Sequence, residues 1–192
     1  MIIQFCGLSG AGKTTLATLV KENLERRCQA VEVIDGDEYR KTLCRGLGFS
    51  LEDRKENMRR MAFVAAQLAK HGVISIISSI NPYREIRKEI KDMYTDVKLV
   101  YIDCALPVLE QRDTKELYRK ASLPQGHPDK LYNLTGVSDR FDIPVKPDLY
   151  INTANQSIEA CGLKLLRFIE GHLTVAKTEI HPFVLRPTAK VV

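Results

Sequence analysis

The sequence has 192 residues, which is enough for one domain with a sizeable hydrophobic core. Its 44% hydrophobic and 28% charged residues are ordinary for a folded domain and argue against a disordered chain. The net charge of +5 comes without any Trp and with only 7% aromatic residues, so small anionic substrates suit the composition better than nucleic acid.

The sequence indicates neither export nor a membrane span, so a cytoplasmic location without membrane contact is expected. No apolar run approaches the ~20 residues of a membrane helix, and no basic region followed by an apolar core opens the chain. The five scattered cysteines contain no C-x-x-C pair, and the four histidines form no cluster. We therefore expect neither disulfides nor structural zinc.

A complete phosphate-binding loop lies almost at the N-terminus. The pattern G-x-x-x-x-G-K-[ST] runs from Gly7 to Thr14, between a β-prone stretch and a helical pattern. Its glycines let backbone N–H groups turn toward phosphate oxygens, and the following helix adds its positive end. Lys13 can reach the outer phosphates, and the Thr14 hydroxyl can bind Mg²⁺. The predicted site for a nucleoside triphosphate comprises Gly7, Leu8, Ser9, Gly10, Ala11, Gly12, Lys13, Thr14 and Thr15.

Strand-like and helical patterns alternate along the chain. Short β-prone runs lie at 2–6, 30–34, 73–78, 97–103 and 148–152. Helical patterns lie at 16–20, 52–71 and 83–93, shortly after Pro107, and at 157–172. Five strands separated by helices predict an α/β P-loop fold, a three-layer α/β/α sandwich with a mostly parallel five-stranded sheet.

Two segments fall outside this alternation. Residues 112–147 are charged, punctuated by Pro and Gly, and longer than an ordinary loop, which predicts a lid that closes over substrates and excludes water. Residues 174–192 have no clear period, and we assign them no role. The expected organisation is one kinase domain at 1–173 followed by this tail.

Polar residues gather beyond the C-terminal ends of the predicted strands, where ligands of such sheets bind. Asp35 and Asp37 follow the second strand, residues 79–83 the third and Asp103 the fourth. We expect Asp35 and Asp37 to face the phosphate loop across the first strand, one holding Mg²⁺ through water and the other accepting a proton from an attacking hydroxyl. The alternative is that Asp37 caps a following helix, a role that does not require Asp35.

A second polar cluster lies at the start of the long central helix. Ser50 and Asp53 form a good capping box, which leaves Phe49, Arg54 and Asn57 unexplained. Arg54 and Asn57 share one helical face, where Arg54 could pair with an anionic group while Phe49 stacks on a base. The alternative is a charged face exposed to solvent.

These features favour a small-molecule kinase. A GTPase would need an N-K-x-D motif, which the sequence lacks, and the third strand ends in Ser78-Ser79 rather than in the Asp usual for transport ATPases. The motifs G-L-S-G-A-G-K-T-T, D-G-D-x-x-R and G-F-S-x-x-D-R-x-E-N-x-R-R occur in this order. With I-x-P-Y-R, Q-R-D-x-K-x-L-Y and T-G-V further along, they resemble the adenylylsulfate kinase family over residues 2–172.

The resemblance implies an enzyme that uses ATP and Mg²⁺ to phosphorylate the 3′-hydroxyl of adenosine 5′-phosphosulfate (APS), giving 3′-phosphoadenylyl sulfate for sulfate assimilation. It also implies a homodimer and an association with a sulfurylase. By the family motifs, the catalytic residues are Lys13, Asp35, Asp37 and Lys115, and the Mg²⁺ ligands are Thr14 and Asp35. Arg112 joins the phosphate loop on the ATP side. The acceptor would contact Asp37, Arg40, Phe49, Arg54, Asn57, Ile80, Lys115, Lys120 and Leu134.

Some positions depart from the family pattern. Asn81 replaces a serine that is reported as phosphorylated in many members, which implies direct transfer from ATP. Leu134 replaces an aromatic residue that would face Phe49, so we expect weaker binding of the acceptor base. Thr114 and Glu116 replace the Pro and Gly of the lid motif. Two alternatives therefore stay open, namely a kinase for another small acceptor and a weakened nucleotide-binding regulatory module.

Overall fold

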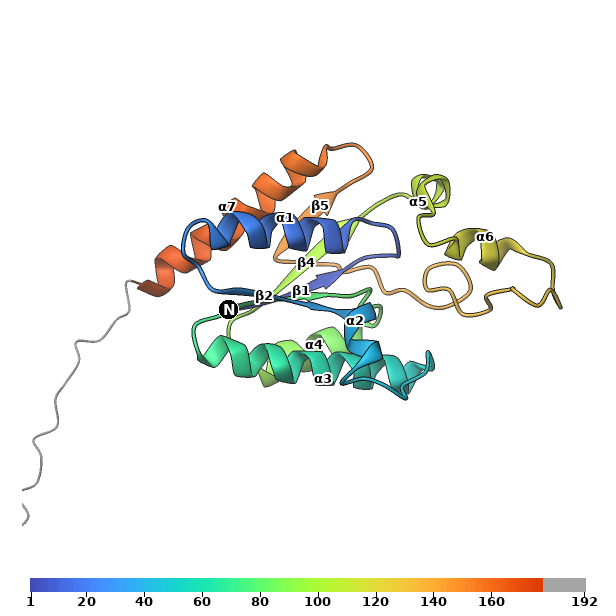
Figure 1. Cartoon of the computed structure of the whole chain (residues 1–192), viewed down its shortest axis with the longest axis horizontal. Coiled ribbons are helices and arrows are strands. Elements are labelled where there is room, and N and C mark those ends of the chain that lie inside the picture. The colour runs from blue at the N-terminus through green and yellow to red at the C-terminus, as the bar shows by residue number, and fades with distance from the viewer. Residues whose placement is uncertain (178–192) are drawn as a thin grey trace, which may run out of the picture.

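Five strands form one sheet between two layers of helices in the computed structural model, which describes residues 1–177 (Figure 1). The strands are β1 (Ile2–Cys6), β2 (Val31–Asp35), β3 (Ile74–Ser78), β4 (Val97–Asp103) and β5 (Leu149–Asn152). Their order across the sheet is β2-β3-β1-β4-β5, and every neighbouring pair is parallel. The predicted α/β fold with a parallel five-stranded sheet is confirmed.

Helices cover both faces of this sheet and extend past one end of it. They are α1 (Lys13–Glu25), α2 (Gly36–Lys41), α3 (Leu51–Lys70), α4 (Arg84–Met93), α5 (Leu106–Arg112), α6 (Leu117–Ser122) and α7 (Ile158–Lys177). The helices α1 and α7 lie side by side on one face, α3 and α4 lie on the other, and α5 and α6 lie beyond the strand ends (Figure 1). Within residues 1–177, no helix is both long and apolar enough to cross a bilayer.

The two faces of the central strand β1 belong to two separate hydrophobic clusters. Ile3 and Phe5 are fully buried in the cluster that contains α1 and α7, whereas Ile2 packs with Met58 and Met61 of α3. Side chains alternate along a strand, so one apolar run can fill both clusters. Burial of each such side chain stabilises the fold by roughly 1.5–3 kcal/mol. The sheet is therefore packed on both faces, and the polar loops extend from the C-terminal ends of its strands.

Most elements lie close to their predicted ranges, but the strand order corrects one expectation. Ile77 of β3 lies beside Gln4 on one side and beside Ile34 on the other. The end of β2 is therefore separated from β1 by β3, and the expectation that β2 lies next to the first strand is wrong. Asp35 nevertheless reaches the phosphate loop, as expected, through a hydrogen bond from Thr14. A helix after Asp37 was expected only as part of the capping alternative, and α6 was not predicted, because helices of six residues are too short to show a helical period.

The C-terminal part also differs from the prediction in one respect. Helix α7 continues to Lys177, past the predicted end at 172. The domain boundary at 173 stays a prediction, and residues 178–192 of the predicted tail lie outside the described residues. Residues 112–147, called the 112–147 segment below, contain α6 and a hydrogen-bonded turn at 134–139.

Candidate active site

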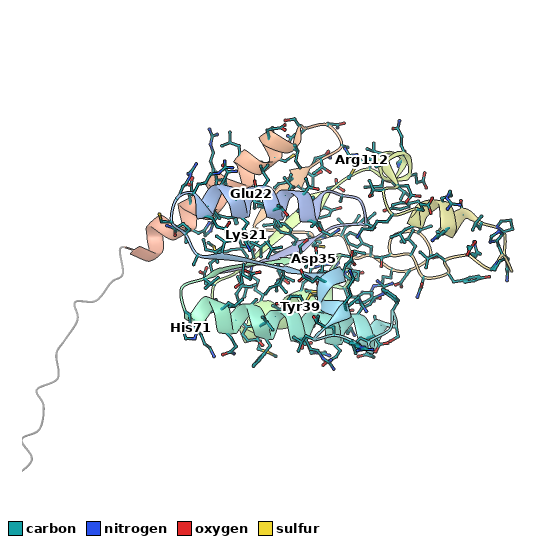
Figure 2. All side chains as sticks on the ribbon, viewed as in Figure 1. Lys21, Glu22, Asp35, Tyr39, His71 and Arg112 are labelled. Atoms are coloured by element: carbon teal, nitrogen blue, oxygen red, sulfur yellow. The ribbon has the colours of Figure 1, made fainter. Side chains whose placement is uncertain are left out.

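A cavity of about 700 Å³ lies at the C-terminal edge of the sheet, where the sequence predicts the ligand site. This volume is within the usual range for small-molecule sites. The cavity walls come from the β1–α1 loop, the end of β2, the start of α3, the β3–α4 loop and the 112–147 segment. Figure 2 shows Asp35 and Arg112, which both line the cavity, at the same end of the sheet.

The β1–α1 loop is shaped to hold an anion. Helix α1 starts directly after Gly12, whose φ of 88° is left-handed, and no described side chain caps the helix or places a negative charge in its first turn. The N–H groups and the positive end of the helix are therefore available to a phosphate. The loop residues in the cavity wall are Ser9, Gly10, Gly12, Lys13, Thr14 and Thr15, and the described wall does not include Gly7, Leu8 or Ala11.

Gly7 shapes the loop from outside the cavity wall. A Cβ atom at this position would lie 2.2 Å from the carbonyl oxygen of Ile102 in β4. The N–H group of Gly7 also donates a hydrogen bond to the carbonyl oxygen of Ile80 at 3.1 Å. Only glycine lets the backbone pass this close to β4, so Gly7 contributes to the site through the loop conformation.

Lys13 supplies the positive charge of the loop. Its Nζ atom donates a hydrogen bond to the carbonyl oxygen of Leu8 at 2.7 Å, which holds the side chain over the loop. Burial lowers the pKa of this ammonium group from 10.5 to about 8, because the surrounding protein atoms replace water. An anionic phosphate would favour the charged form again.

We expect kcat/KM for ATP to fall as the pH rises through about 8, because Lys13 of the free enzyme loses its proton there. Below that pH the ammonium group is charged and can bind phosphate. Steady-state kinetics between about pH 7 and pH 10 checks this. Lys13→Arg is the matched control because arginine stays charged over this range, and an equal fall in that variant would contradict the assignment.

Asp35 joins the end of β2 to the phosphate loop. Its Oδ2 atom accepts a hydrogen bond from the Thr14 hydroxyl at 2.9 Å, and Ser78 Oγ lies 3.3 Å from the same hydroxyl. Its Oδ1 atom accepts from the N–H groups of Asp37 and Glu38 at 2.9 and 3.4 Å, which caps α2. The residue that caps α2 is therefore Asp35, and the alternative that Asp37 caps this helix is wrong.

Asp37 instead contacts the 112–147 segment. Its carboxylate forms an ion pair with the Lys115 ammonium group. The same segment makes a second contact, in which the Tyr118 hydroxyl donates a hydrogen bond to the carbonyl oxygen of Ser9 at 2.8 Å. Both Asp37 and Lys115 line the cavity, so the 112–147 segment reaches the phosphate loop and the end of β2 together.

Two guanidinium groups lie close to the ring of Phe49. The Cζ atoms of Arg40 and Arg54 lie 4.5 and 5.4 Å from the centre of its ring, which places both within cation–π range. The side chain is 54% exposed and lines the cavity. That Phe49 stacks on a base stays a prediction, and the two cationic neighbours of its ring were not predicted from the sequence.

Arg54 is buried and held by the protein itself. Its Nε atom donates to the carbonyl oxygen of Phe49 at 2.9 Å, and Nη2 donates to that of Asn133 at 2.9 Å. The same Nη2 lies 3.3 Å from the Asp139 carboxylate. The guanidinium group therefore connects α3 to the 134–139 turn in addition to lining the cavity, and the alternative of a solvated charged face does not describe it.

The remaining predicted residues divide into two groups. Arg112 lies at the end of the cavity that contains Thr153, whose carbonyl oxygen accepts a hydrogen bond from Arg112 Nη2 at 2.7 Å. The cavity wall also includes Arg40, Asn57, Ile80 and Leu134. It includes Asn81 as well, which departs from the family pattern. Lys120 of α6 is not among the described residues of the wall, so the structure does not bring it to the cavity.

Two findings at the sheet edge differ from expectation. Asp103 accepts hydrogen bonds from the hydroxyls of Tyr101 and Tyr150 at 2.9 and 2.7 Å, and it is not among the described residues of the cavity wall. Ser78 and Thr135 line the cavity although no role was assigned to them. Their only signals in the sequence were the end of the third strand and the T-G-V motif.

Comparisons with known proteins agree with this geometry. The family model described as adenylylsulphate kinase matches residues 1–152. The adenylyl-sulfate kinase of Synechococcus sp. strain JA-3-3Ab is 42% identical over 170 residues, covering 88% of this chain and 94% of the relative. A probable bifunctional SAT/APS kinase of Sorangium cellulosum is 39% identical over 169 residues, covering 88% of this chain and 28% of the relative.

A solved structure gives the same assignment. The APS kinase of Mycobacterium tuberculosis, in complex with AMPPNP and APS, superposes with a TM-score of 0.82 at 33% identity, covering 88% of this chain and 96% of that one. The match of the family model over most of the chain and the identity to whole relatives lead to one conclusion. This chain belongs to the adenylylsulphate kinase family.

Proposed function

We propose that this chain transfers the γ-phosphoryl group of ATP to the 3′-hydroxyl of APS, giving 3′-phosphoadenylyl sulfate. The observation that carries the proposal is that one cavity joins the phosphate loop to the cluster of Arg40, Phe49 and Arg54. The loop suits a triphosphate donor, and the cluster suits an acceptor with a base and an anionic group. The activity named for the related proteins supports both assignments.

The cavity must first offset repulsion between two anionic substrates. Lys13 lies at the phosphate loop, Arg40 and Arg54 lie beside Phe49, and Lys115 reaches in from the 112–147 segment. Phosphoryl transfer depends mainly on positioning and on such charge stabilisation. Removing one of these contacts typically costs about 2–4 kcal/mol in the transition state.

The ligand atoms at the end of β2 fit Mg²⁺. The Thr14 hydroxyl and the Asp35 carboxylate offer hard oxygen ligands, and Thr14 Oγ1 lies 2.9 Å from Asp35 Oδ2. Magnesium in nucleotide enzymes is usually held by one or two such groups, with phosphate oxygens and waters completing the shell. When bound, the ion would neutralise part of the phosphate charge.

Asp37 is the residue best placed to accept the proton of the 3′-hydroxyl. It lines the cavity two residues after Asp35, and its carboxylate is oriented by Lys115. A carboxylate within hydrogen-bond reach of the hydroxyl can take this proton as the phosphoryl group is transferred. Lys115 then serves two purposes, since it fixes the base and adds positive charge near the transferred group.

Asn81 favours direct transfer without a phosphorylated protein. Its Nδ2 group donates a hydrogen bond to Gln4 Oε1 at 3.0 Å, so the amide is fixed in a buried position beside the cavity. An amide nitrogen is not a nucleophile of the hydroxyl type used in covalent catalysis. The phosphoryl group would therefore pass from ATP to the acceptor in one step.

The cellular setting of this activity is also a proposal. We propose a cytoplasmic homodimer that receives APS from an associated sulfurylase. The association is supported by the relative named as a bifunctional SAT/APS kinase.

A panel of acceptors tests the proposal. We expect kcat/KM with APS to exceed that with AMP, gluconate and a free nucleoside by at least about 100-fold, the scale on which charged contacts discriminate. A better rate with any of the other acceptors would point to a different small-molecule kinase. ATP binding without transfer to any acceptor would point to the regulatory module instead.

A further inference from the structure

Three buried polar atoms in residues 1–177 have no hydrogen-bond partner, namely Asn57 Oδ1, Asn81 Oδ1 and Thr135 Oγ1. All three residues line the same cavity. A buried polar atom without a partner is unfavourable, and native proteins contain few of them. Their shared position indicates that a bound ligand supplies the missing hydrogen bonds.

Thr135 is held rigidly by the turn at 134–139. The carbonyl oxygen of Leu134 accepts from the N–H groups of three residues, Val137, Ser138 and Asp139. The N–H group of Gly136 in turn donates to the carbonyl oxygen of Asp139 at 2.8 Å. With the residue only 1% exposed, the Thr135 hydroxyl has little freedom to find another partner by moving.

The turn is attached to both ends of the candidate active site. Gly136 has a left-handed φ of 84°, and a Cβ atom there would lie 2.5 Å from Leu8 Cδ2 of the phosphate loop. On the other side, Arg54 binds Asn133, which precedes the turn, and Asp139, its last residue. The turn that carries Thr135 thus contacts both the phosphate loop and the arginine assigned to the acceptor.

The surrounding charge selects the group that this hydroxyl would meet. Arg54 and Lys13 line the same cavity as Thr135 and favour anionic oxygens in it, and a threonine hydroxyl can donate one hydrogen bond to such an oxygen. Resting on the proposed function, we propose that Thr135 is a further substrate-binding residue that donates a hydrogen bond to an oxygen of the phosphosulfate group of APS. Asn57 and Asn81, by contrast, offer acceptor oxygens to hydroxyl or amino hydrogens.

Thr135→Val tests this role because valine keeps the shape and removes the hydroxyl. We expect the Kd of APS, measured by calorimetry with a nonhydrolysable ATP analogue present, to rise at least about 10-fold, the scale of one hydrogen bond to a charged group. The Kd of the ATP analogue should stay within about twofold, since the loop itself is unchanged. The Tm of the free protein should rise, because an unpaired buried polar group is lost.

Two further variants make the result decisive. Thr153→Val removes a hydroxyl that already bonds the carbonyl oxygens of Ala11 and Asp103 at 3.0 and 3.3 Å, so its Tm should fall. Thr135→Ser should retain tight APS binding. An unchanged Kd for APS in Thr135→Val, or a lower Tm with weaker binding of both nucleotides, would overturn the proposal.

The proposed function is decided separately from the role of Thr135. The Kd is measured without turnover, so a wild-type protein that binds APS but transfers no phosphate contradicts only the proposed reaction. In that case the Kd of APS for Thr135→Val, compared with that for the wild type, still supports or overturns the hydrogen bond from Thr135.

Discussion

Asp35→Asn is expected to lower kcat by roughly 100- to 1,000-fold while changing the free energy of unfolding by less than about 0.5 kcal/mol. Asp35 has two separable roles, since Oδ1 caps α2 and Oδ2 accepts a hydrogen bond from Thr14. Asparagine caps helices as well as aspartate does, but it lacks the negative charge that a magnesium site needs. Stopped-flow transfer assays and urea unfolding measure the two effects separately.

Asp35→Ala is the matched control because it removes both roles. It should show the same loss in kcat and, in addition, lower the free energy of unfolding by about 1 kcal/mol through the missing cap. An Asp35→Asn enzyme with nearly normal kcat would mean that capping is the main role of Asp35. The magnesium assignment of this residue would then be wrong.

Arg54→Met should raise the KM of the acceptor by at least about 30-fold, because a charge contact worth 2 kcal/mol or more is removed. Methionine fills much of the space of the buried stem without the charge. The carbonyl oxygens of Phe49 and Asn133 and the carboxylate of Asp139 also lose their donor. We therefore expect the free energy of unfolding to fall by about 1–3 kcal/mol as well.

The KM for ATP shows whether Arg54→Met weakens acceptor binding specifically or disturbs the whole active site. It should change by less than about threefold in Arg54→Met, because no contact to the phosphate loop is removed. Arg60→Ala provides a control on the same helix, since Arg60 binds Glu56 and the carbonyl oxygen of Leu43, outside the cavity wall described here. Equal increases in both KM values for Arg54→Met would refute the acceptor role.

The parts of the fold that could be predicted depend on local signals. Some segments can be predicted from a few neighbouring residues, and the structure places them as expected. These are the strands at 2–6 and 97–103 and the loop that begins at Gly7. The order of the strands is not local. Each strand is apolar enough to be central, so the sequence offered no means to know that β3 separates β1 from β2.

The candidate site shows the same division. The residue types were predictable because phosphate and anion chemistry restrict them, but their partners come from distant segments. The capping role of Asp35 depends on β2 ending one residue later than predicted, so that α2 begins at Gly36. Arg40 lies at the ring of Phe49 because its guanidinium group donates hydrogen bonds to the carbonyl oxygens of Leu47 and Gly48, just before Phe49. The partners of Arg54 and the unpartnered Thr135 hydroxyl likewise depend on segments that are distant in the sequence.

The most direct test of the central claim is to follow the γ-phosphate itself. Enzyme mixed with ATP labelled at the γ-phosphate and with APS should yield labelled 3′-phosphoadenylyl sulfate, from which a 3′-nucleotidase releases the label. During a single turnover no label should appear on the protein, as Asn81 predicts. Label that stays in ATP, is released as phosphate, or appears at another position of the acceptor would contradict the account.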